Sequence, residues 1–372
     1  MTKILLRSLI ASVFLCAVNR SQSLRPQPVF SRPVFLRAKA NALLSLFLPT
    51  KAQPVNDKLR HVNTLELPLT FLPRGGCLAV RMYINNRQGD TRVFSYSAII
   101  DTGSPFVTAP SAIQSYSRDE SGRYPPTQEQ YGATSGGMQW RSIDSVEFRT
   151  TDLDEPFQEI TKMVVGVPDD NVVDDTGGIF LGLIAQDDYR PTLLQQLGYS
   201  SFTLDYPNKI LKFYRTGVIA EEDPDAMELF DFAPYGKDLY HYGIVSPFVR
   251  LFLDGRKGPT TISSFKRPVI AVIDTGLTGC VFSDSLHLEL LSRGYYESLD
   301  QVNGLQVSLE TTTGQILTLS SNPNYWFLTD IKLPWFDDDD KHPHVIAMGA
   351  TFLSDSRLSI DPFSRKAKIQ IA

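Results

Sequence analysis

The sequence predicts an all-β protein made of two similar lobes with a few short helices. Residues 98–104 and 271–277 are two runs of the same kind, in which an apolar, β-branched stretch ends at Asp-Thr-Gly. Each run reads as a buried strand that enters a tight turn. A glycine-bounded apolar segment and then a hairpin follow each run in the same order. These segments lie at residues 179–182 and 201–213 in the first half and at residues 345–349 and 357–369 in the second. Sustained helical patterns are missing, so the repeat indicates duplicated, mainly β lobes.

The composition is that of a globular protein. With 372 residues, of which 42% are hydrophobic and 21% are charged, the chain is long enough for two domains. Its formal net charge of −5 indicates no basic face for nucleic acid. We therefore expect no nucleic-acid partner.

The N-terminal region has a composition of its own. No acidic residue precedes Asp57, and Lys3 and Arg7 precede an apolar run at residues 9–18. This run is too short to span a bilayer but has the length of a signal-peptide core. The sequence thus predicts a signal peptide at residues 1–23, entry into the secretory pathway, and no stable membrane span once the signal peptide is removed.

Residues 24–60 leave three alternatives open. Up to residue 56 the segment contains arginine but no acidic residue, and it resembles a transit peptide behind a signal peptide, as in algae with complex plastids. The alternatives are the propeptide of a secreted or vacuolar protein and a signal anchor. Only Cys77 and Cys280 lie beyond the predicted signal peptide, and no Asn-x-Ser/Thr sequon does. Secreted two-domain proteins usually carry more disulfides, so both observations favour the plastid.

Residues 61–215 are predicted to form the first lobe. At residues 130–138, small residues and glycines surround Tyr131 between strand-like flanks, which indicates a mobile hairpin tip or a plain surface turn. A short helix is predicted at residues 191–197, closed by Gly198. The predicted strands lie at residues 64–69, 77–84, 93–100 and 163–167, with a hairpin turn at 87–90 and a closing hairpin at 201–214.

Residues 216–240 are predicted to form an acidic linker between the lobes, and residues 241–372 to form the second lobe. A helix is predicted at residues 283–294, with Ser283 as its N-cap. Residues 337–344 contain four adjacent carboxylates and two histidines. Nothing there sets a ligand geometry, so we expect a solvated charged loop and not a metal site.

Asp101 and Asp274 meet at a cleft if the two lobes pack about a pseudo-two-fold axis. Like charges at contact distance cannot both ionise, so one carboxyl keeps its proton and the pair titrates as a unit. The ionised aspartate can take a proton from a water, while the protonated one donates to a peptide carbonyl. Peptide hydrolysis then proceeds through a tetrahedral diol with no metal and no cofactor. The Thr after each Asp can hold the opposite lobe by hydrogen bonds, and the Gly lets backbone amides approach the carboxylates.

With both motifs in place, the sequence resembles the pepsin-like (family A1) aspartic proteases over residues 61–372. The resemblance rests on the two Asp-Thr-Gly motifs, on Tyr131-Gly132 at the position of the substrate-covering flap, and on the paired apolar segments that end in glycine. It implies a bilobal double β-barrel with pseudo-two-fold symmetry, a monomer, and an extended polypeptide as substrate. The catalytic residues that it implies are Asp101 and Asp274. The further site residues that it implies are Thr102, Gly103, Ser104, Thr275, Gly276 and Thr278 as active-site support and Tyr131, Gly132 and Thr134 in the substrate-binding flap.

Three features depart from the family pattern. Leu277 stands where the family usually has a Thr or Ser whose hydroxyl bonds to the second carboxylate, and Thr278 comes one residue late. Losing a donor to the charged form favours protonation, so we predict a dyad whose apparent pKa is higher than in typical members. Thr108 stands where pepsins carry a Trp that bonds to the flap Tyr. The disulfides of secreted members have no counterpart among Cys77 and Cys280.

Three other roles compete with proteolysis. Asp-Thr-Gly alone is common turn chemistry with a purely structural role. ATP-binding phosphotransferases of the actin and sugar-kinase type also carry two Asp-x-Gly turns, but they are α/β proteins with long helices, which this sequence does not predict. A binding or inhibitor protein that keeps the protease fold without its activity is the alternative to an enzyme, and Leu277 and Thr108 favour it. No Gly-x-Ser-x-Gly or His-Glu-x-x-His motif offers another hydrolase.

Overall fold

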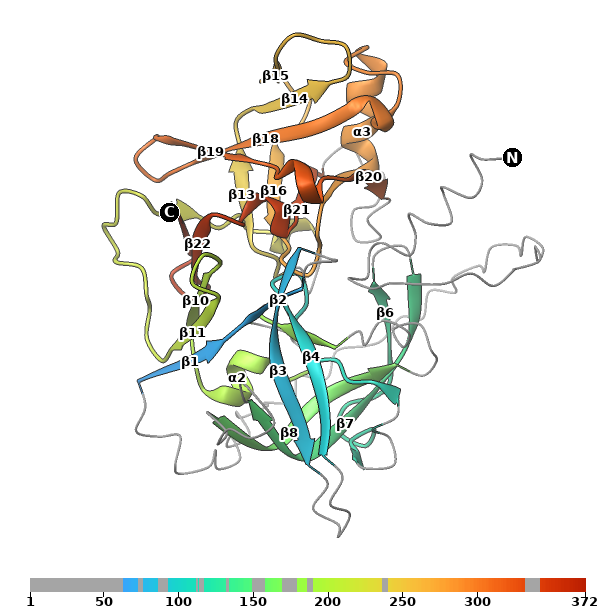
Figure 1. Cartoon of the computed structure of the whole chain (residues 1–372), viewed down its shortest axis with the longest axis vertical. Helices are drawn as coiled ribbons and strands as arrows, with labels where there is room; N and C mark the ends of the chain where they lie inside the picture. Colours follow the sequence, from blue (N-terminus) through green and yellow to red (C-terminus); the bar gives the residue numbers. More distant parts are fainter. Residues whose placement is uncertain are drawn as a thin grey trace, which may run out of the picture.

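The computed structural model describes residues 63–72, 76–85, 93–111, 113, 117–131, 134–148, 158–168, 179–185, 190–235, 240–331 and 342–372. These residues form two lobes that are rich in strands, with the C-terminal lobe above the N-terminal lobe in Figure 1. The mainly β, bilobal architecture predicted from the repeat is therefore confirmed. The predicted targeting segments up to residue 60, the hairpin turn at 87–90 and the acidic run at 337–340 lie outside the described residues.

The N-terminal lobe is built on a sheet of eight strands. They span Thr70–Leu72 (β2), Cys77–Asn85 (β3), Val93–Asp101 (β4), Arg118–Asp119 (β5), Thr127–Tyr131 (β6), Thr134–Phe148 (β7), Gln158–Pro168 (β8) and Phe180–Gly182 (β9). The main path runs β5-β7-β3-β4-β9, while β2 pairs with β3, and β6 and β8 pair with β7. The long strand β7 therefore belongs to the core sheet at one end and to a hairpin with β6 at the other.

The C-terminal lobe contains a five-stranded and a four-stranded sheet. Their strands span Gly243–Ser246 (β13), Val249–Leu253 (β14), Thr260–Ile262 (β15), Val269–Ile273 (β16), Cys280–Ser283 (β17), Val302–Glu310 (β18), Ile316–Ser320 (β19), Leu328–Ile331 (β20) and His344–Met348 (β21). The strand orders are β13-β16-β21-β17-β20 and β15-β14-β18-β19. All five residues of β16 are buried, which explains why this run is continuously apolar.

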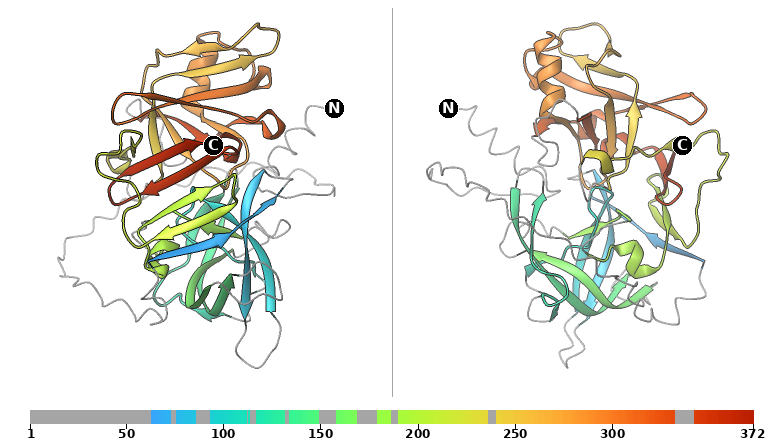
Figure 2. Two further views of the ribbon diagram at one scale, coloured as in Figure 1. Left: turned by 60° about the vertical axis from the view of Figure 1, so that its left-hand side comes forward. Right: turned by 180° about the vertical axis from the view of Figure 1, so that it is seen from behind.

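A fourth sheet, of six strands, joins the lobes. Its strands span Thr64–Pro68 (β1), Ser201–Asp205 (β10), Ile210–Tyr214 (β11), Met227–Glu228 (β12), Ser356–Asp361 (β22) and Lys366–Ile371 (β23). The order is β1-β11-β10-β22-β23-β12, so the closing hairpins of the two halves lie side by side, as Figure 2 shows. Phe202 pairs with Ile360, and Leu204 pairs with Leu358. Both predicted hairpins are confirmed, and their pairing forms the junction between the lobes.

Two short α-helices occur among the described residues. α2 (Leu193–Leu197) begins at a capping box on Thr192 and ends at Gly198 in the left-handed conformation, as predicted. α3 (Asp284–Ser292) also lies where a helix is predicted and has Ser283 at its N-cap position, but the Ser283 side chain makes no capping hydrogen bond. The Ser283 hydroxyl accepts the N–H of Val345 instead (3.0 Å). Single 3-10 turns occur at Ala233–Tyr235, Leu299–Gln301, Pro323–Tyr325 and Ala350–Phe352.

The apolar core continues from one lobe into the other. One buried cluster contains Ile100 and Phe213 of the first half together with Phe282 and Leu358 of the second. Cys77 and Cys280 are buried and are not joined in a disulfide. Within the described ranges, no helix is long and apolar enough to cross a membrane.

Candidate active site

Each Asp-Thr-Gly turn begins where a buried strand ends. β4 ends at Asp101, and β16 ends at Ile273, one residue before Asp274. A parallel neighbour fixes each end, since β9 pairs with β4 and β21 pairs with β16. The Leu183 N–H donates to the carbonyl of Asp101 (2.7 Å), and the Asp274 N–H donates to the carbonyl of Met348 (2.9 Å). The two aspartates therefore occupy equivalent places in the two lobes.

The threonines of the two turns bind the lobes to each other. The Thr102 hydroxyl donates to the Ile273 carbonyl (2.8 Å), and the Thr275 hydroxyl donates to the Ile100 carbonyl (2.7 Å). Each hydroxyl also accepts a backbone N–H, from Thr275 at 3.0 Å and from Thr102 at 3.1 Å. Both side chains are fully buried. Because every bond crosses from one turn to the other, this network fixes how the two turns face each other.

The glycines let the two carboxyl groups approach. A β-carbon on Gly103 would lie 2.7 Å from the carboxyl carbon of Asp274, and one on Gly276 would lie 2.6 Å from that of Asp101. Non-bonded carbon atoms do not come this close, so a side chain at either position would displace the opposite carboxyl. With glycine at both positions, the side chains of Asp101 and Asp274 are hydrogen-bonded to each other.

The two carboxyl groups have different donors. Asp101 accepts the Gly103 N–H at Oδ1 (2.7 Å) and the Ser104 hydroxyl at Oδ2 (2.5 Å). Burial raises the pKa of Asp101, and these hydrogen bonds oppose the rise. Burial and the neighbouring Asp101 charge raise the pKa of Asp274 well above its ordinary value, against backbone amides that include that of Leu277. The two carboxyl groups therefore titrate as a pair that retains one proton, and the Gly103 N–H and the Ser104 hydroxyl favour the charged form of Asp101.

Leu277 is buried at the second turn, where the family pattern has a hydroxyl. The hydroxyl of Thr278 lies 3.6 Å from the Cys77 sulfur, and this sulfur lies 4.0 Å from the carbonyl oxygen of Gly276. Thr278 is thus beside the second turn, with its hydroxyl toward the N-terminal lobe. Residue 277 therefore offers no hydroxyl to the Asp274 carboxyl, and a dyad with a higher apparent pKa than in typical members of the family stays a prediction.

Two solved structures resemble the fold over most of the chain. An aspartic proteinase from Irpex lacteus aligns with 83% of this chain and 97% of its own, with a TM-score of 0.54 and 14% sequence identity. The fold is pepsin-like. Basic 7S globulin from soybean aligns with 84% of this chain and 97% of its own, with a TM-score of 0.53 and 10% identity. No protein-family model matches the sequence, and a comparison with curated proteins finds no match. The structural likeness confirms the predicted fold and goes no further.

In this pepsin-like fold, the hairpin predicted as a flap is formed by β6 and β7. The two strands pair from Thr127 opposite Met138 to Tyr131 opposite Thr134. Tyr131 and Thr134 therefore flank the turn, while Gly132 and the side chains of both flanking residues lie outside the described part of the chain. Figures 1 and 2 show the hairpin rising from the N-terminal lobe toward the C-terminal lobe.

Thr108 connects strands within the N-terminal lobe. Its hydroxyl accepts the Phe180 N–H (2.8 Å), and its own N–H donates to the Phe180 carbonyl (3.0 Å). It also bridges to Gly166 of β8. The position at which pepsin-like proteases carry a flap-binding Trp is therefore taken by a buried residue that joins the loop after Asp101 to β8 and β9.

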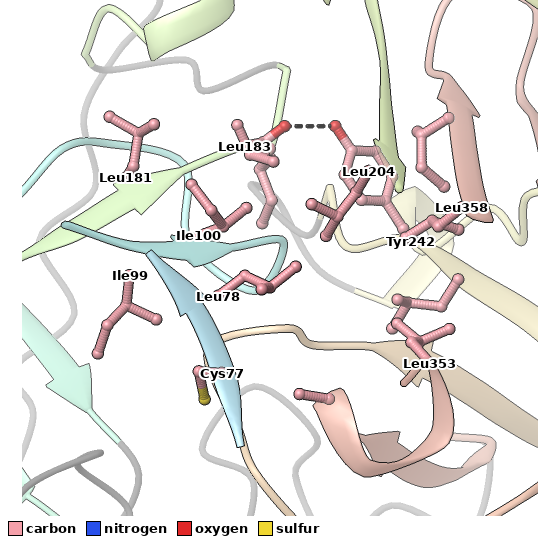
Figure 3. Packing of buried hydrophobic residues seen from close by; sticks show 14 of the residues in the cluster. Cys77, Leu78, Ile99, Ile100, Leu181, Leu183, Leu204, Tyr242, Leu353 and Leu358 are labelled. Carbon is pink, nitrogen blue, oxygen red and sulfur yellow. Dashed lines mark hydrogen bonds between the residues drawn. The ribbon is translucent and has the colours of Figure 1, made fainter. Parts of the chain in front are cut away.

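Tyr242 is a residue of this region that no sequence motif singles out. Its hydroxyl donates to the Leu183 carbonyl (2.7 Å) and accepts the Ala185 N–H (3.0 Å). Figure 3 shows the bond to Leu183, the residue whose N–H holds the carbonyl of Asp101. Burial raises the pKa of Tyr242, so its hydroxyl stays protonated. Because its partners are backbone atoms nearly sixty positions earlier, only the fold could reveal this link between the lobes.

The prediction that His344 belongs to a solvated loop is wrong. His344 begins β21 and is 1% exposed, because it pairs in register with Val269 of the buried strand β16. Its Nε2 lies 2.8 Å from Glu289 Oε2, and its Nδ1 lies 3.0 Å from the Ser285 hydroxyl. Among the described residues, no three His, Cys, Asp or Glu side chains come together as a metal site would require.

Proposed function

We propose that the protein is an aspartic endopeptidase, which hydrolyses peptide bonds with a water activated by Asp101 and Asp274. The observation that carries this proposal is the pair of carboxyl groups, Asp101 buried and Asp274 half-buried, that are hydrogen-bonded to each other where the two lobes meet. One proton shared by two such groups supplies a base and an acid within reach of one peptide bond. The pepsin-like fold, which an aspartic proteinase shares, supports the proposal.

The hydrogen-bond donors of the first turn assign the roles of the two carboxyl groups, because they stabilise a charge on Asp101. Asp101, whose carboxylate is stabilised by Ser104, takes a proton from the water as the water oxygen attacks the peptide carbonyl carbon. Asp274 gives its proton to the carbonyl oxygen, and a neutral tetrahedral diol forms. Asp101 then passes its proton to the amide nitrogen, the C–N bond breaks, and Asp274 recovers a proton from a diol hydroxyl. Both carboxyl groups are back in their starting states when the two product chains leave.

The substrate in this proposal is a polypeptide in an extended conformation, covered by the β6–β7 hairpin. Tyr131, Gly132 and Thr134 are the hairpin residues proposed to contact it. An extended chain suits a site between a strand hairpin and two strand-end turns, because it presents backbone groups to both sides. We propose that the protein acts as a monomer without a cofactor.

A binding or inhibitor protein with the same fold is the second candidate. Leu277 favours it, because a hydroxyl expected beside the second carboxylate is replaced by a buried apolar side chain. One of the two structural neighbours is named as a globulin and not as a protease. A protein of this kind would bind an extended peptide without cutting it.

The deciding experiment incubates residues 57–372 with a denatured protein between pH 3 and pH 7. The proposal expects cleavage that pepstatin inhibits and that Asp101→Asn and Asp274→Asn each abolish. Cleavage that survives either substitution would remove the proposed mechanism. Pepstatin binding without any cleavage by the unaltered protein would support the second candidate.

We also propose that the chain enters the secretory pathway through the signal peptide at residues 1–23. Its destination is a plastid if residues 24–60 are a transit peptide, as in algae with complex plastids, or the outside or a vacuole if they are a propeptide. A fusion of residues 1–60 to a fluorescent reporter separates these destinations. Export of the reporter to the medium would contradict the plastid alternative.

A further inference from the structure

The guanidinium of Arg190 lies on two aromatic rings of the N-terminal lobe. Its central carbon is 5.1 Å from the centre of the Phe106 ring and 4.9 Å from that of the Trp140 ring. The two rings meet edge to face with their centres 4.8 Å apart. Nη1 of Arg190 also donates to the Thr127 hydroxyl (3.1 Å). Both rings are buried, and cation–π attraction is strongest where water is excluded.

Phe106 belongs to the loop that follows Asp101. The backbone of this loop is held in place, since the Ile184 N–H donates to the Ser104 carbonyl (3.0 Å). A β-carbon on Gly182 would lie 2.4 Å from the Phe106 carbonyl oxygen, so β9 lies directly against the loop. The Phe106 ring is therefore a fixed support connected to the active-site turn.

Trp140 and Thr127 belong to the two strands of the β6–β7 hairpin. Thr127 begins β6 and pairs with Met138 of β7, two residues before Trp140. A β-carbon on Gly166 would lie 3.2 Å from the Trp140 ring and 2.9 Å from the Met138 sulfur, so β8 packs closely behind both side chains. Arg190 thus contacts both strands of the hairpin at its base and the active-site loop at the same time.

We propose that Arg190 is a positioning residue that fixes the base of the β6–β7 hairpin on the loop of Asp101. It thereby sets how the hairpin stands over the two carboxyl groups. We call these contacts of Arg190 with Phe106, Trp140 and Thr127 the tether. An effect of the tether on substrate binding rests on the proposed function, whereas the existence of the tether does not. Tyr131 lies four residues beyond Thr127, about 13 Å along an extended strand, so Arg190 acts through the hairpin and not by touching the substrate.

The chemistry of the contact requires arginine. A planar guanidinium can stack on an aromatic face while it donates a hydrogen bond in its own plane. A lysine ammonium is a point charge and cannot reproduce this combination. The tether also connects the active-site loop to the hairpin. In the family pattern a Trp at position 108 binds the flap, but here position 108 is a threonine whose hydroxyl bonds to the Phe180 N–H.

The tether is tested by hydrogen exchange on the full chain, a measurement that needs no catalysis. Arg190→Met keeps the apolar stem but removes the charge and the donor. We expect the amides of residues 127–131 and 134–140 to exchange about tenfold faster than in the unaltered protein, from the loss of the ring contacts and one hydrogen bond. Arg190→Lys retains the charge and should restore part of the protection.

Arg250→Met is the matched control. Arg250 lies 5.2 Å from the centre of the Phe248 ring in the C-terminal lobe and also donates to a side chain, that of Gln306. This variant should leave exchange in the hairpin unchanged. Thr127→Val removes the hydroxyl that accepts the Arg190 bond and should accelerate the same amides by about threefold. If Arg190→Met fails to fold, Thr127→Val still tests whether the Arg190 contact protects the hairpin.

Kinetics provide a second readout if the protein cleaves peptides. Arg190→Met should raise KM about five- to tenfold and leave kcat and the pH profile within about twofold, because the dyad is untouched. If the unaltered protein cleaves nothing, the proposed function fails while hydrogen exchange still decides the tether. The proposal is overturned if hydrogen exchange in the hairpin is unchanged in Arg190→Met, or in Thr127→Val if Arg190→Met does not fold. It is also overturned if Arg250→Met accelerates exchange in the hairpin as much as Arg190→Met does.

Discussion

Thr275→Val measures how strongly the crossed threonine bonds hold the two turns together. Valine has nearly the shape of threonine but offers no hydrogen-bonding group. The change leaves the Ile100 carbonyl and the Thr102 N–H buried without the hydroxyl that they bond at 2.7 and 3.1 Å. A buried polar group deprived of its partner costs about 1–3 kcal/mol. With two such groups, we expect the free energy of unfolding to fall by about 2–6 kcal/mol, a large part of the stability of an ordinary protein.

Urea denaturation at pH 7, followed by tryptophan fluorescence, measures this loss. Thr203→Val is the control, because Thr203 is also buried at the junction but bonds to the Ser359 hydroxyl, which can rotate to another partner. We expect it to lose about 0.5–1.5 kcal/mol. Thr275→Ser keeps the hydroxyl and should lose about 1 kcal/mol with the methyl group. A loss in Thr275→Val no larger than that in Thr203→Val would refute the reasoning.

Three further predictions concern pH. Asp274→Asn should abolish cleavage and raise Tm at pH 7 but not at pH 3. The folded pKa of Asp274 lies above its unfolded value, so the Asp274 carboxyl destabilises the folded protein increasingly as pH rises, and asparagine removes this effect. Leu277→Thr should move the alkaline limb of the pH–rate profile down by about one pH unit, since a hydroxyl now stabilises the charged Asp274; an unmoved limb contradicts this. Burial lowers the pKa of His344. Hydrogen bonds from His344, from the Lys266 backbone N–H and from Arg293 together outweigh burial and hold the pKa of Glu289 below its ordinary value. A histidine or glutamate whose folded pKa is depressed destabilises the folded state as pH falls, so Tm should decline from pH 7 to pH 4. His344→Gln should make the decline between pH 7 and pH 5 shallower without removing it, because burial lowers the pKa of His241 to about 4 and His241 still contributes.

The strands that carry the dyad could be predicted because their burial leaves a local pattern. β16 is buried along its whole length, so its run is apolar at every position and stops at Asp274. The order of motif, apolar segment and hairpin repeats in both halves, and the sheets repeat it in space. The crossed bonds of Thr102 and Thr275 also follow from residue type, once the two turns are expected to face each other.

The residues that were not predicted depend on contacts between distant parts of the chain. His344 follows a charged run, yet pairing with Val269 places it inside the sheet. Ser283 has the right type for a helix cap, but its hydroxyl bonds to the backbone of β21. Arg190 and Tyr242 act on partners far from them in sequence. For His344 and Ser283, a long-range contact overrides what the local sequence pattern predicts. For Arg190 and Tyr242, no local pattern indicates the contact.

The six-stranded sheet has a consequence for how the protein is synthesised. β10 lies between β11 and β22, so one of its edges is covered only by residues near the end of the chain. Chains fold from the N-terminus as they emerge from the ribosome, and an open strand edge pairs readily with other chains. The N-terminal lobe therefore carries an open, aggregation-prone edge on β10 for the whole time that the second lobe is being translated.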